Sequence, residues 1–562
     1  MTSALVELRV LEGPNLYFPR AAVKLTLDLT QLIDAPEPVA LRLAASIGLR
    51  QVRPGEPASG FRQRFAARAT GRLVRQIARE SGTTRLAVRM RPARDVHQIV
   101  VAYPWRNRTR ALALGQAVAD VLDALLSPAL EELVSSAAAA VRDAGAGPGP
   151  TTVRPRVPVV AVTGTNGKTT TARMIAHIAR VHGLHVGWSS TDGIYVDGEL
   201  VEPGDYSGPS GAARVLAHEE VQLAVTETAR GGILLKGIGV AYNHVSVFTN
   251  VSADHLGLQG IDTVDQLAEV KGVVSRITRP DGWAVLNGDD PRVFATRASI
   301  RARPWVFSRD PDSPAIRETL TSGGRATTVI DGWLSVLGAG SDADPLIEVA
   351  DIPMTLAGLS RFNVENALGA ASAALGVGLP REAVIEGLRS FRPDPEHNPG
   401  RMNFFTRDDV SVVVDLAHNQ AGLEALLEIM NGVRRPGARL LLALGAVGDR
   451  QDEVVDSLGE TSARDADVLV VAHKVRYLRG RTTAELDELF RAGAARVGVT
   501  DVPSYPTEVD ALEALVDQAG PGDVVGLMCH EDRQGVYDWL AGRGFTSDTP
   551  ETLREKVRAA SG

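Results

Sequence analysis

The chain has 562 residues, 44% of them hydrophobic, and a formal net charge of −8 at pH 7. This length predicts about three to four domains, and the acidic balance without basic runs argues against nucleic acid or a membrane surface as a partner. The single cysteine, Cys529, excludes an intramolecular disulfide and a zinc site built on several thiolates. The N-terminal residues lack a signal-peptide pattern, and no apolar run is long enough to span a bilayer. We therefore expect a cytoplasmic protein.

Residues 1–135 predict a small α+β domain that contains no cluster of catalytic residue types. The next stretch, 136–157, is rich in Ala and then in Gly and Pro, which predicts a linker whose first part is able to complete a helix. Alternating sequence predicts strands over 5–11, 22–29 and 97–103, and an amphipathic pattern predicts a helix over 111–126.

Residues 158–395 are predicted to form a central parallel-sheet domain that begins with a phosphate-binding loop. A β-branched run precedes this loop and a helical pattern follows it, so its backbone N–H groups and the helix start can hold phosphate. Lys168 adds a mobile cation, and Thr169 offers a hydroxyl to Mg²⁺. Val162 stands where the general Walker pattern has glycine, so the signal is a shorter form of that pattern; a simple glycine turn is the alternative. The loop residues are Gly164, Thr165, Asn166, Gly167, Lys168, Thr169 and Thr170.

Acidic residues follow two further predicted strands of the central domain. Glu227 ends one strand, and Asp254 with His255 follows the next; in a parallel sheet such strand ends meet at one edge, where a carboxylate can hold Mg²⁺. A capping glutamate and a structural histidine are the alternatives. Lys271 lies in a predicted helix, where periodicity alone favours a solvated side chain.

Residues 396–562 predict a second, Rossmann-like α/β domain. Arg401 follows a Pro-Gly turn near the domain junction and suits a γ-phosphate, with a surface arginine as the alternative. Asp415 ends a strand and is placed for a ribose hydroxyl. Asn363 and Asn366, three residues apart, can share a helix face and read adenine, although a capping role is equally consistent. Strands of this domain are predicted over 411–415, 439–444, 467–472 and 523–528.

Taken together, these motifs resemble the Mur ligase family, the ATP-dependent amide ligases of peptidoglycan precursor and folylpolyglutamate synthesis. They occur in the order of that family at 164–170, 227–229, 254–255, 363–366, 399–401 and 415–418. Within the family, the sequence resembles the Mur-ligase half of the cyanophycin synthetases most closely, through segments at 191–195, 227–234, 254–257, 448–453 and 478–481. Residues 11–16 resemble the N-terminal domain of the same enzymes, in which an ATP-grasp domain stands where this chain has its Gly/Pro linker.

The resemblance implies roles for the candidate residues. Lys168 and the loop amides would bind the β- and γ-phosphates of ATP, Thr169 and Glu227 would hold one Mg²⁺, and His255 a second. Lys271 is similar in position to a lysine that is carbamylated in many Mur ligases, where the carbamate supports a metal. Asn363 and Asn366 would bind adenine, Asp415 would bind the ribose, and Arg401 would bind the γ-phosphate. The residues implied to contact the substrate are Thr191, Asp192, Ser207 and His418.

The hypothesis for function is an ATP- and Mg²⁺-dependent ligase. A substrate carboxylate would be activated as an acyl phosphate and then coupled to the amine of an amino acid. The carboxylate would belong to a small molecule or peptide, and a separate ATP-grasp enzyme could supply it. A Mur or folylpolyglutamate ligase with another acceptor, and a nucleotide-binding partner without catalysis, are the alternatives. Whether the chain forms a homo-oligomer is left open by the sequence.

Overall fold

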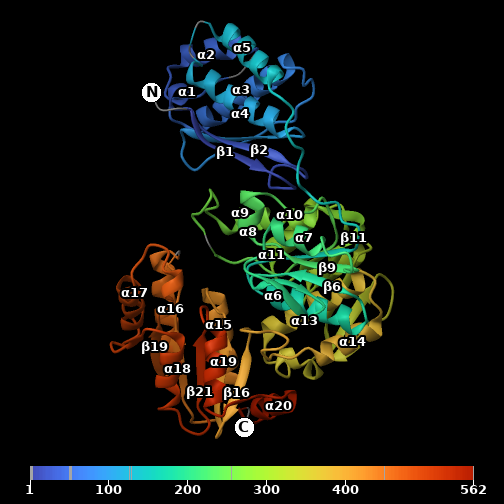
Figure 1. Cartoon of the computed structure of the whole chain (residues 1–562), viewed down its shortest axis with the longest axis vertical. Coiled ribbons are helices and arrows are strands. Elements are labelled where there is room, and N and C mark those ends of the chain that lie inside the picture. The colour runs from blue at the N-terminus through green and yellow to red at the C-terminus, as the bar shows by residue number, and fades with distance from the viewer. Residues whose placement is uncertain are drawn as a thin grey trace.

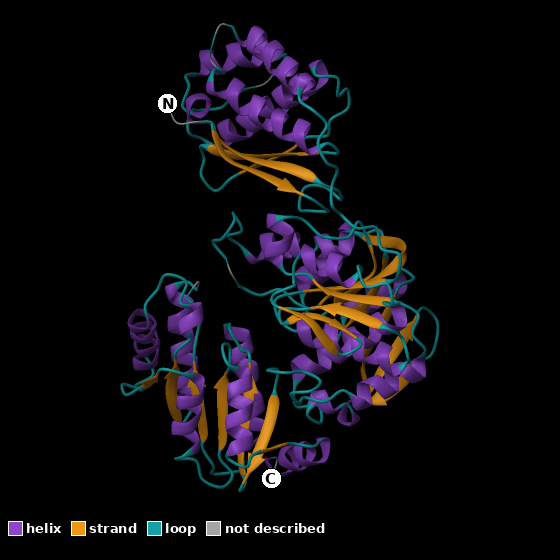
Figure 2. Cartoon of the chain, viewed as in Figure 1, coloured by secondary structure: helices purple, strands orange, loops and turns teal. Residues whose placement is uncertain are grey.

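The computed structural model describes residues 4–49, 53–125, 127, 129–254, 256–448 and 450–560. Three sheets follow one another along the chain, each with its own helices (Figure 1, Figure 2). We call the corresponding parts the N-terminal, central and C-terminal units. This arrangement confirms the predicted multidomain α/β fold. Among the described residues, no helix combines the length and apolar character needed to cross a bilayer.

The N-terminal unit is an antiparallel sheet in the order β1-β2-β4-β3, with its helices packed over one face (Figure 2). Alternation in β2 buries Val23, Leu25 and Leu27 beneath these helices. The strands are β1 (Leu5–Leu11), β2 (Ala22–Asp28), β3 (Arg89–Pro92) and β4 (Gln98–Pro104). The helices are α1 (Thr30–Ile33), α2 (Glu37–Ser46), α3 (Gly60–Glu80), α4 (Arg108–Asp123) and α5 (Leu130–Asp143).

The Ala-rich first part of the predicted linker at 136–157 completes a helix, as its sequence allows. Helix α5 continues to Asp143, and Ala138 and Val141 are buried in the core of the N-terminal unit. The Ala-rich part of the expected linker at 136–157 is therefore helical, because its apolar residues recur at helical spacing and have a surface to cover. The extended connection begins at Ala144.

The central unit is built on an eleven-stranded mixed sheet in the order β15-β14-β13-β12-β11-β10-β5-β9-β6-β7-β8. Strands β6, β9, β5, β10, β11, β12 and β13 run parallel, whereas β7, β8, β14 and β15 form antiparallel margins. Its strands are β5 (Val159–Thr163), β6 (Val186–Ser189), β7 (Gly193–Val196), β8 (Glu199–Pro203), β9 (Leu223–Glu227), β10 (Asn243–Phe248), β11 (Thr278–Asn287), β12 (Arg303–Phe307), β13 (Arg325–Ile330), β14 (Trp333–Gly338) and β15 (Asp344–Glu348). Its α-helices are α6 (Lys168–Val181), α7 (Pro209–Val215), α8 (Arg230–Leu235), α9 (Val264–Lys271), α10 (Val273–Arg276), α11 (Pro291–Ala295), α12 (Pro314–Thr321), α13 (Arg361–Gly376) and α14 (Arg381–Ser390).

The C-terminal unit is a seven-stranded sheet in the order β20-β19-β18-β21-β17-β16-β22, of which the first five strands are parallel. Its strands are β16 (Asn403–Arg407), β17 (Val410–Asp415), β18 (Leu440–Leu444), β19 (Val468–Ala472), β20 (Ser504–Tyr505), β21 (Val524–Met528) and β22 (Thr546–Ser547). Its α-helices are α15 (Gln420–Val433), α16 (Asp452–Asp465), α17 (Thr483–Ala495), α18 (Glu508–Val516), α19 (Arg533–Gly542) and α20 (Pro550–Ala560).

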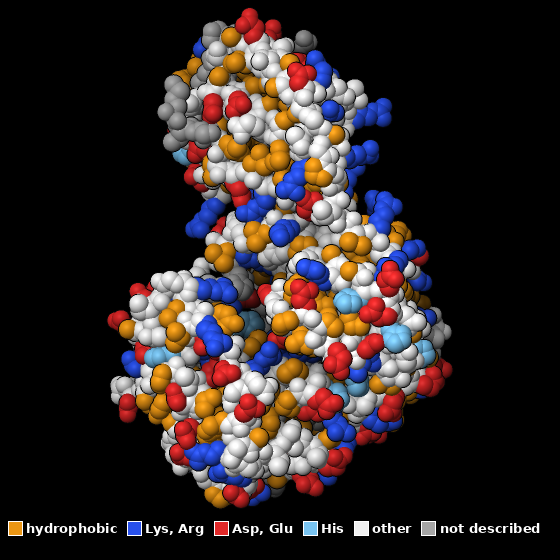
Figure 3. Space-filling model, in the orientation of Figure 1, with side chains coloured by type: hydrophobic (Ala, Val, Ile, Leu, Met, Phe, Trp, Pro, Cys, Tyr) orange, Lys and Arg blue, Asp and Glu red, His pale blue; other side chains and the backbone are white. Residues whose placement is uncertain are grey.

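The carboxyl ends of parallel strands in the central and C-terminal units are brought close to each other. The loop after β5 and the loop after β17 touch, because the side-chain amides of Asn166 and Asn419 exchange hydrogen bonds of 3.0 and 3.4 Å. Ligands of open α/β sheets bind at such strand ends. On the face drawn in Figure 3 the surface is hollowed between the two units.

Candidate active site

The predicted phosphate-binding loop has the backbone that its glycines predict. It joins β5 to α6, and Gly164 and Gly167 adopt φ values of 152° and 84°. A Cβ on Gly164 would lie 1.9 Å from Oγ1 of Thr249, and one on Gly167 would lie 2.2 Å from Oδ1 of Asn366. Both positions therefore require glycine for backbone conformation and for space.

The segment after β10 holds this loop in place. The N–H of Thr165 donates to the carbonyl of Asn250 at 2.9 Å, and the N–H of Asn166 donates to the Asn250 side chain at 2.9 Å. The Thr249 hydroxyl donates to the Asn166 carbonyl at 2.6 Å. The loop is thus fixed from the neighbouring strand end and does not depend on a ligand for its shape.

Two lysines lie at the loop, Lys168 half-buried and Lys271 buried. Nζ of Lys168 donates to the carbonyl of Thr165 at 2.8 Å, and Nζ of Lys271 donates to the carbonyl of Gly164 at 2.5 Å. Burial lowers the pKa of Lys168, while Glu227 acts to raise it. Burial, followed by repulsion from Lys168, holds the pKa of Lys271 well below its usual value. Lys271 is only 4% exposed, so the solvated helix lysine favoured by periodicity is wrong, because α9 turns this residue toward the loop.

Thr169 and Glu227 form the oxygen-rich part of the site. The Thr169 hydroxyl donates to Oε1 of Glu227 at 2.7 Å, and Oε2 of Glu227 accepts the N–H of Thr191 at 3.1 Å. Glu227 is 1% exposed, and this burial raises its pKa. A hydroxyl and a buried carboxylate beside a phosphate loop are oxygen donors of the kind Mg²⁺ prefers, so the residues fit that ion. His255, the expected ligand of a second ion, lies outside the described residues, and among those described no group of three or more His, Cys, Asp or Glu side chains is arranged for a metal.

The C-terminal unit contributes Arg401, Asp415 and His418 to the same place. Nη2 of Arg401 lies 3.5 Å from the Thr169 hydroxyl, and Oδ2 of Asp415 accepts the N–H of Met402 at 2.9 Å. Burial raises the pKa of Asp415 and lowers that of His418 to about 4, so this imidazole is neutral at pH 7. Arg401, Asp415 and His418 line one cavity together with the phosphate loop. His418, an expected substrate residue, therefore lies in the same cavity as this loop.

Asn363 and Asn366 complete this cavity from the first two turns of α13. Ser360 caps the helix by accepting the N–H of Asn363 at 3.4 Å, so the two amides need not cap it themselves. Nδ2 of Asn366 donates to Oδ1 of Asn363 at 3.0 Å, and Oδ1 of Asn366 accepts the Thr171 hydroxyl at 3.2 Å. The predicted common helix face is confirmed, and it lies against the phosphate loop.

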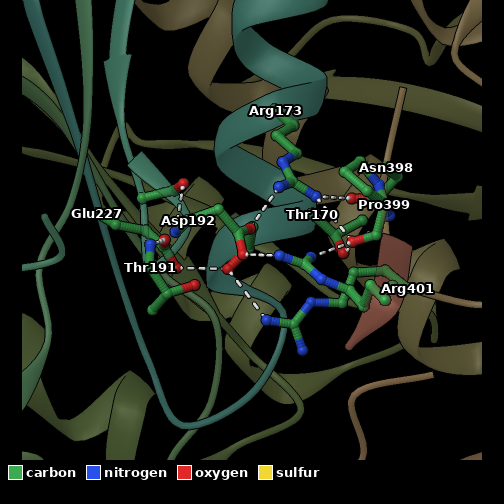
Figure 4. A network of polar contacts seen from close by, with 12 residues as sticks. Thr170, Arg173, Thr191, Asp192, Glu227, Asn398, Pro399 and Arg401 are labelled. Atoms are coloured by element: carbon green, nitrogen blue, oxygen red, sulfur yellow. Dashed lines mark hydrogen bonds and ion pairs between the residues drawn. The ribbon is translucent and has the colours of Figure 1, made fainter. Parts of the chain in front are cut away.

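The carboxylate of Asp192, an expected substrate residue, accepts hydrogen bonds from two arginines (Figure 4). Nη2 of Arg173 in α6 donates to Oδ2 of Asp192 at 2.5 Å, and Nη2 of Arg533 at the start of α19 donates to Oδ1. The carbonyl of Pro399 accepts from both arginines, at 3.3 and 3.0 Å. Burial raises the pKa of Asp192, but Arg173 and Arg533 outweigh it and hold the pKa below its usual value. The carboxylate thus joins the central unit to the C-terminal unit.

Ser207, another expected substrate residue, is also engaged within the protein. Its hydroxyl donates to Oδ1 of Asp205 at 2.7 Å, and its carbonyl accepts the N–H of Ala229 at 2.7 Å. The serine therefore lies beside the segment that follows Glu227.

A further ion pair closes the C-terminal unit over the central one. Nη1 of Arg450, from the segment after β18, donates to Oδ1 of Asp254 at 2.5 Å, and both side chains are largely buried. Together with the Asn166–Asn419 contact, it links the two units. The structure is therefore a closed arrangement in which both units reach the phosphate loop.

Three residues at this junction are absent from the predicted site. Arg173 and Arg533 pair with Asp192, and His530 follows β21 with both ring nitrogens buried. Burial, followed by repulsion from Lys474, holds the pKa of His530 well below its usual value. The sequence signal for His530 is its position just after the apolar strand β21, because polar residues that bind ligands collect at the carboxyl ends of parallel strands. A charged residue inside the apolar pattern of α6 is the signal for Arg173.

Comparison with known proteins places the chain in a family. Residues 162–374 match the Mur ligase middle domain, and residues 400–529 match the Mur ligase glutamate ligase domain. A diaminopimelate-adding ligase of Thermosynechococcus vestitus, named UDP-N-acetylmuramoyl-L-alanyl-D-glutamate--2,6-diaminopimelate ligase, is 31% identical over 404 residues, or 67% of this chain and 72% of that protein.

Cyanophycin synthetases are more similar in sequence but are matched over a smaller share of their length. The protein of Crocosphaera subtropica is 40% identical over 371 residues, which cover 66% of this chain and 42% of the relative. The protein of a Synechocystis species is 42% identical over 338 residues, which cover 60% of this chain and 38% of the relative. This chain therefore matches about two fifths of each of these curated relatives.

A solved structure shares the fold. The bifunctional folylpolyglutamate synthase/dihydrofolate synthase with Mn, AMPPNP and L-glutamate bound aligns with a TM-score of 0.50 at 18% identity, over 69% of this chain and 89% of that one. The two matched domains and the relative from Thermosynechococcus carry the conclusion on sequence: the chain belongs to the Mur ligase family.

Proposed function

We propose that this protein is an ATP-dependent ligase that activates a substrate carboxylate as an acyl phosphate and couples it to the amine of an amino acid. The observation that supports this proposal most strongly is the convergence of cations from two units on one cavity. Lys168 reaches it from the phosphate loop, and Arg401 reaches it from the C-terminal unit. Mur ligase family enzymes are ATP-dependent and form amides.

The roles of the residues follow from charge and position. Lys168 and the loop N–H groups bind the β- and γ-phosphates, and Arg401 balances the charge on the phosphoryl group during transfer. Asp415 binds the ribose hydroxyls, and the amides of Asn363 and Asn366 face the adenine. The carboxylate oxygen attacks the γ-phosphorus and ADP leaves; the amine then attacks the acyl carbon, and inorganic phosphate and a proton leave.

Thr169 and Glu227 are the residues that would hold Mg²⁺. Bound there, the ion would neutralise phosphate charge. The closed junction at Asp192 and Asp254 keeps water from the acyl phosphate, which water would otherwise hydrolyse. His255 is proposed as a ligand of a second ion on the resemblance alone.

The cyanophycin synthetases suggest the chemical class of the substrates. Segments shared with these relatives support an amino acid as the amine and a carboxylate on a small molecule or peptide as the acceptor. Thr191, Asp192 and Ser207 are proposed to lie along the acceptor path. Because a short connection stands where those enzymes carry an ATP-grasp domain, we propose that a separate ATP-grasp enzyme supplies the acceptor.

A phosphate-release screen tests the proposal. Purified protein with ATP and Mg²⁺ is offered each amino acid with each of a set of acidic acceptors, including products of ATP-grasp enzymes. We expect phosphate release that requires both the amino acid and the acceptor. The Lys168→Ala variant serves as the matched blank and should release no phosphate. ATP hydrolysis that no combination stimulates would contradict a ligase and favour a nucleotide-binding partner.

Lys271 is expected to react with CO₂ when its amine is neutral. The nitrogen attacks the carbon of CO₂, a C–N bond forms and a proton leaves, which gives a carbamate. Because burial lowers the pKa of this amine, a larger share of it is neutral at a given pH than for a solvated lysine. As the pH falls through the folded pKa, the amine is protonated and the carbamate is lost. We expect activity to fall in CO₂-depleted acidic buffer and to return with bicarbonate.

Labelling with ¹³C-bicarbonate gives the direct measurement. The wild-type protein should show a carbamate signal in its carbon NMR spectrum that the Lys271→Gln variant lacks. An unchanged signal in the variant assigns the carbamate to another lysine, and no signal in either protein leaves Lys271 as the donor to Gly164 seen in the structure.

Arg533→Ala is expected to loosen the closed junction without touching the phosphate loop. The side chain of Arg533 is 28% exposed, so losing its pair with Asp192 should cost about 1 to 2 kcal/mol and about tenfold in turnover. Arg543→Ala is the control, because Arg543 follows the same helix but pairs with Glu513 inside the C-terminal unit. Small-angle scattering should show a larger maximum dimension only for Arg533→Ala; equal effects of the two variants would contradict the role of the junction.

A further inference from the structure

The N-terminal unit differs in charge from the rest of the chain. Residues 1–150 contain 20 Lys and Arg against 13 Asp and Glu, although the whole chain has 60 basic and 68 acidic residues. Figure 3 shows basic side chains gathered along one edge of this unit. The potential around the N-terminal unit therefore attracts anions, whereas the rest of the chain repels them.

A cavity within this unit collects four of these cations. It has a volume of about 520 Å³ and lies between the end of α3, the end of β4, the start of α4 and α5. No residue that lines it also lines the cavity at the phosphate loop, so it is a separate site. Its basic residues are Arg20, Arg85, Arg106 and Arg110.

Within the part of the chain that the structure describes, these four guanidinium groups face no carboxylate. No Asp or Glu lines the cavity, and across the described ranges none of the four forms an ion pair with a carboxylate. Other arginines of the same unit are paired, such as Arg9 with Glu7 and Arg108 with Glu12. Nε of Arg110 is moreover buried without a hydrogen-bond partner. Clustered, unpaired cations repel one another, and a bound anion relieves that repulsion.

The floor of the cavity is apolar and leaves the polar contacts to the rim. Tyr103 and Trp105 are 1% and 5% exposed, and their polar groups are already bound: the Tyr103 hydroxyl donates to the Ala111 carbonyl at 2.8 Å, and Nε1 of Trp105 donates to the Leu11 carbonyl at 3.1 Å. The rim adds neutral polar side chains from Thr83, Thr84 and Asn107. This combination fits a small anion whose charged groups face the arginines and whose body rests on the floor.

We propose that this cavity binds a small polyanion that carries phosphate groups or several carboxylates. Planar guanidinium groups donate two parallel hydrogen bonds to the oxygens of either group, and this geometry favours them over single-point cations. The ligand site stands apart from ATP binding and from ligation, so its existence does not depend on the proposed function. Because Arg110 also donates to the carbonyl of Ala144 at 3.4 Å, the bound anion sits beside the connection to the central unit.

Calorimetry on the full chain tests this site, with pyrophosphate and citrate as the two probes. The protein carries Lys168→Ala, which weakens anion binding at the phosphate loop. We expect one equivalent of at least one probe to bind, and the added pair Arg85→Ser with Arg106→Ser to weaken that binding at least about tenfold. Binding of pyrophosphate only assigns a phosphate-bearing ligand, and binding of citrate only assigns a polycarboxylate.

The matched control removes two arginines that do not line the cavity. Arg68 and Arg79 are exposed on α3 of the same unit, and their replacement by Ser changes the net charge equally. If this control pair weakens binding as much as the cavity pair, or if neither probe binds, the proposal is overturned. Should the cavity pair fail to fold, Arg20→Ser alone is expected to weaken binding about threefold, and no change in that variant also overturns the proposal.

Discussion

Lys168→Ala is expected to abolish ATP-dependent ligation, with a loss of about 10³-fold in turnover, while the protein stays folded. Lys168 is half-buried at the start of α6, where phosphate charge is proposed to develop, and the charge of Glu227 acts on its ammonium group. A preorganised cation in a water-poor site stabilises that charge far more than one in solvent, so its loss falls on the chemical step. The measurement is amino-acid-dependent phosphate release.

The fold of this variant is not expected to suffer. Lys168 donates a hydrogen bond to the carbonyl of Thr165, and removing its partly desolvated charge also removes a desolvation cost. The melting temperature should therefore remain close to that of the wild type. Lys236→Ala, which replaces a lysine next to α8 and outside the lining of the site, serves as the control. Full turnover by Lys168→Ala would refute the assignment of the loop.

Arg401→Ala is expected to reduce turnover by about 10² to 10³-fold. Arg401 is the cation that the C-terminal unit places near Thr169, with Asp415 as the neighbouring carboxylate. Because it reaches the phosphate loop only when the two units are closed, its loss should affect turnover more than the binding of ATP. Steady-state kinetics for ATP, with binding measured by a fluorescent ATP analogue, separates the two effects.

Arg401→Lys provides the matching test of geometry. Lysine keeps the charge but lacks the fork of donors, so it should restore only part of the rate. A variant that binds ATP weakly but turns over at the normal rate would show that Arg401 acts in binding alone. If Arg401→Ala left turnover unchanged, the alternative that Arg401 is a surface arginine without a role in the reaction would be favoured.

Local patterns in the sequence predict the elements that carry the site. The strand that ends at Glu227 and the strand that ends at Asp415 are short, apolar and bounded by polar residues, and both are found where expected. The loop between β5 and α6 follows from its glycines. Because carboxyl ends of parallel strands share an edge, these local predictions are enough to bring Lys168 and Glu227 together.

Contacts between distant segments could not be predicted in the same way. Arg533 and Asp192 are 341 residues apart, and their pairing depends on how the C-terminal unit packs on the central one. The antiparallel margins of the central sheet, such as β7 with β8, likewise depend on pairing choices that no local pattern encodes. Lys271 shows the same limit, since periodicity placed it in solvent and tertiary packing buried it.

In the proposed reaction, the protein transfers the γ-phosphate of ATP to a substrate carboxylate. The most direct measurement uses an acceptor whose carboxylate is labelled with ¹⁸O and follows the label by mass spectrometry after amide formation. We expect one ¹⁸O atom in each inorganic phosphate released, because the carboxylate oxygen stays with the phosphorus when the amine displaces it. Unlabelled phosphate accompanied by amide formation would contradict the acyl phosphate.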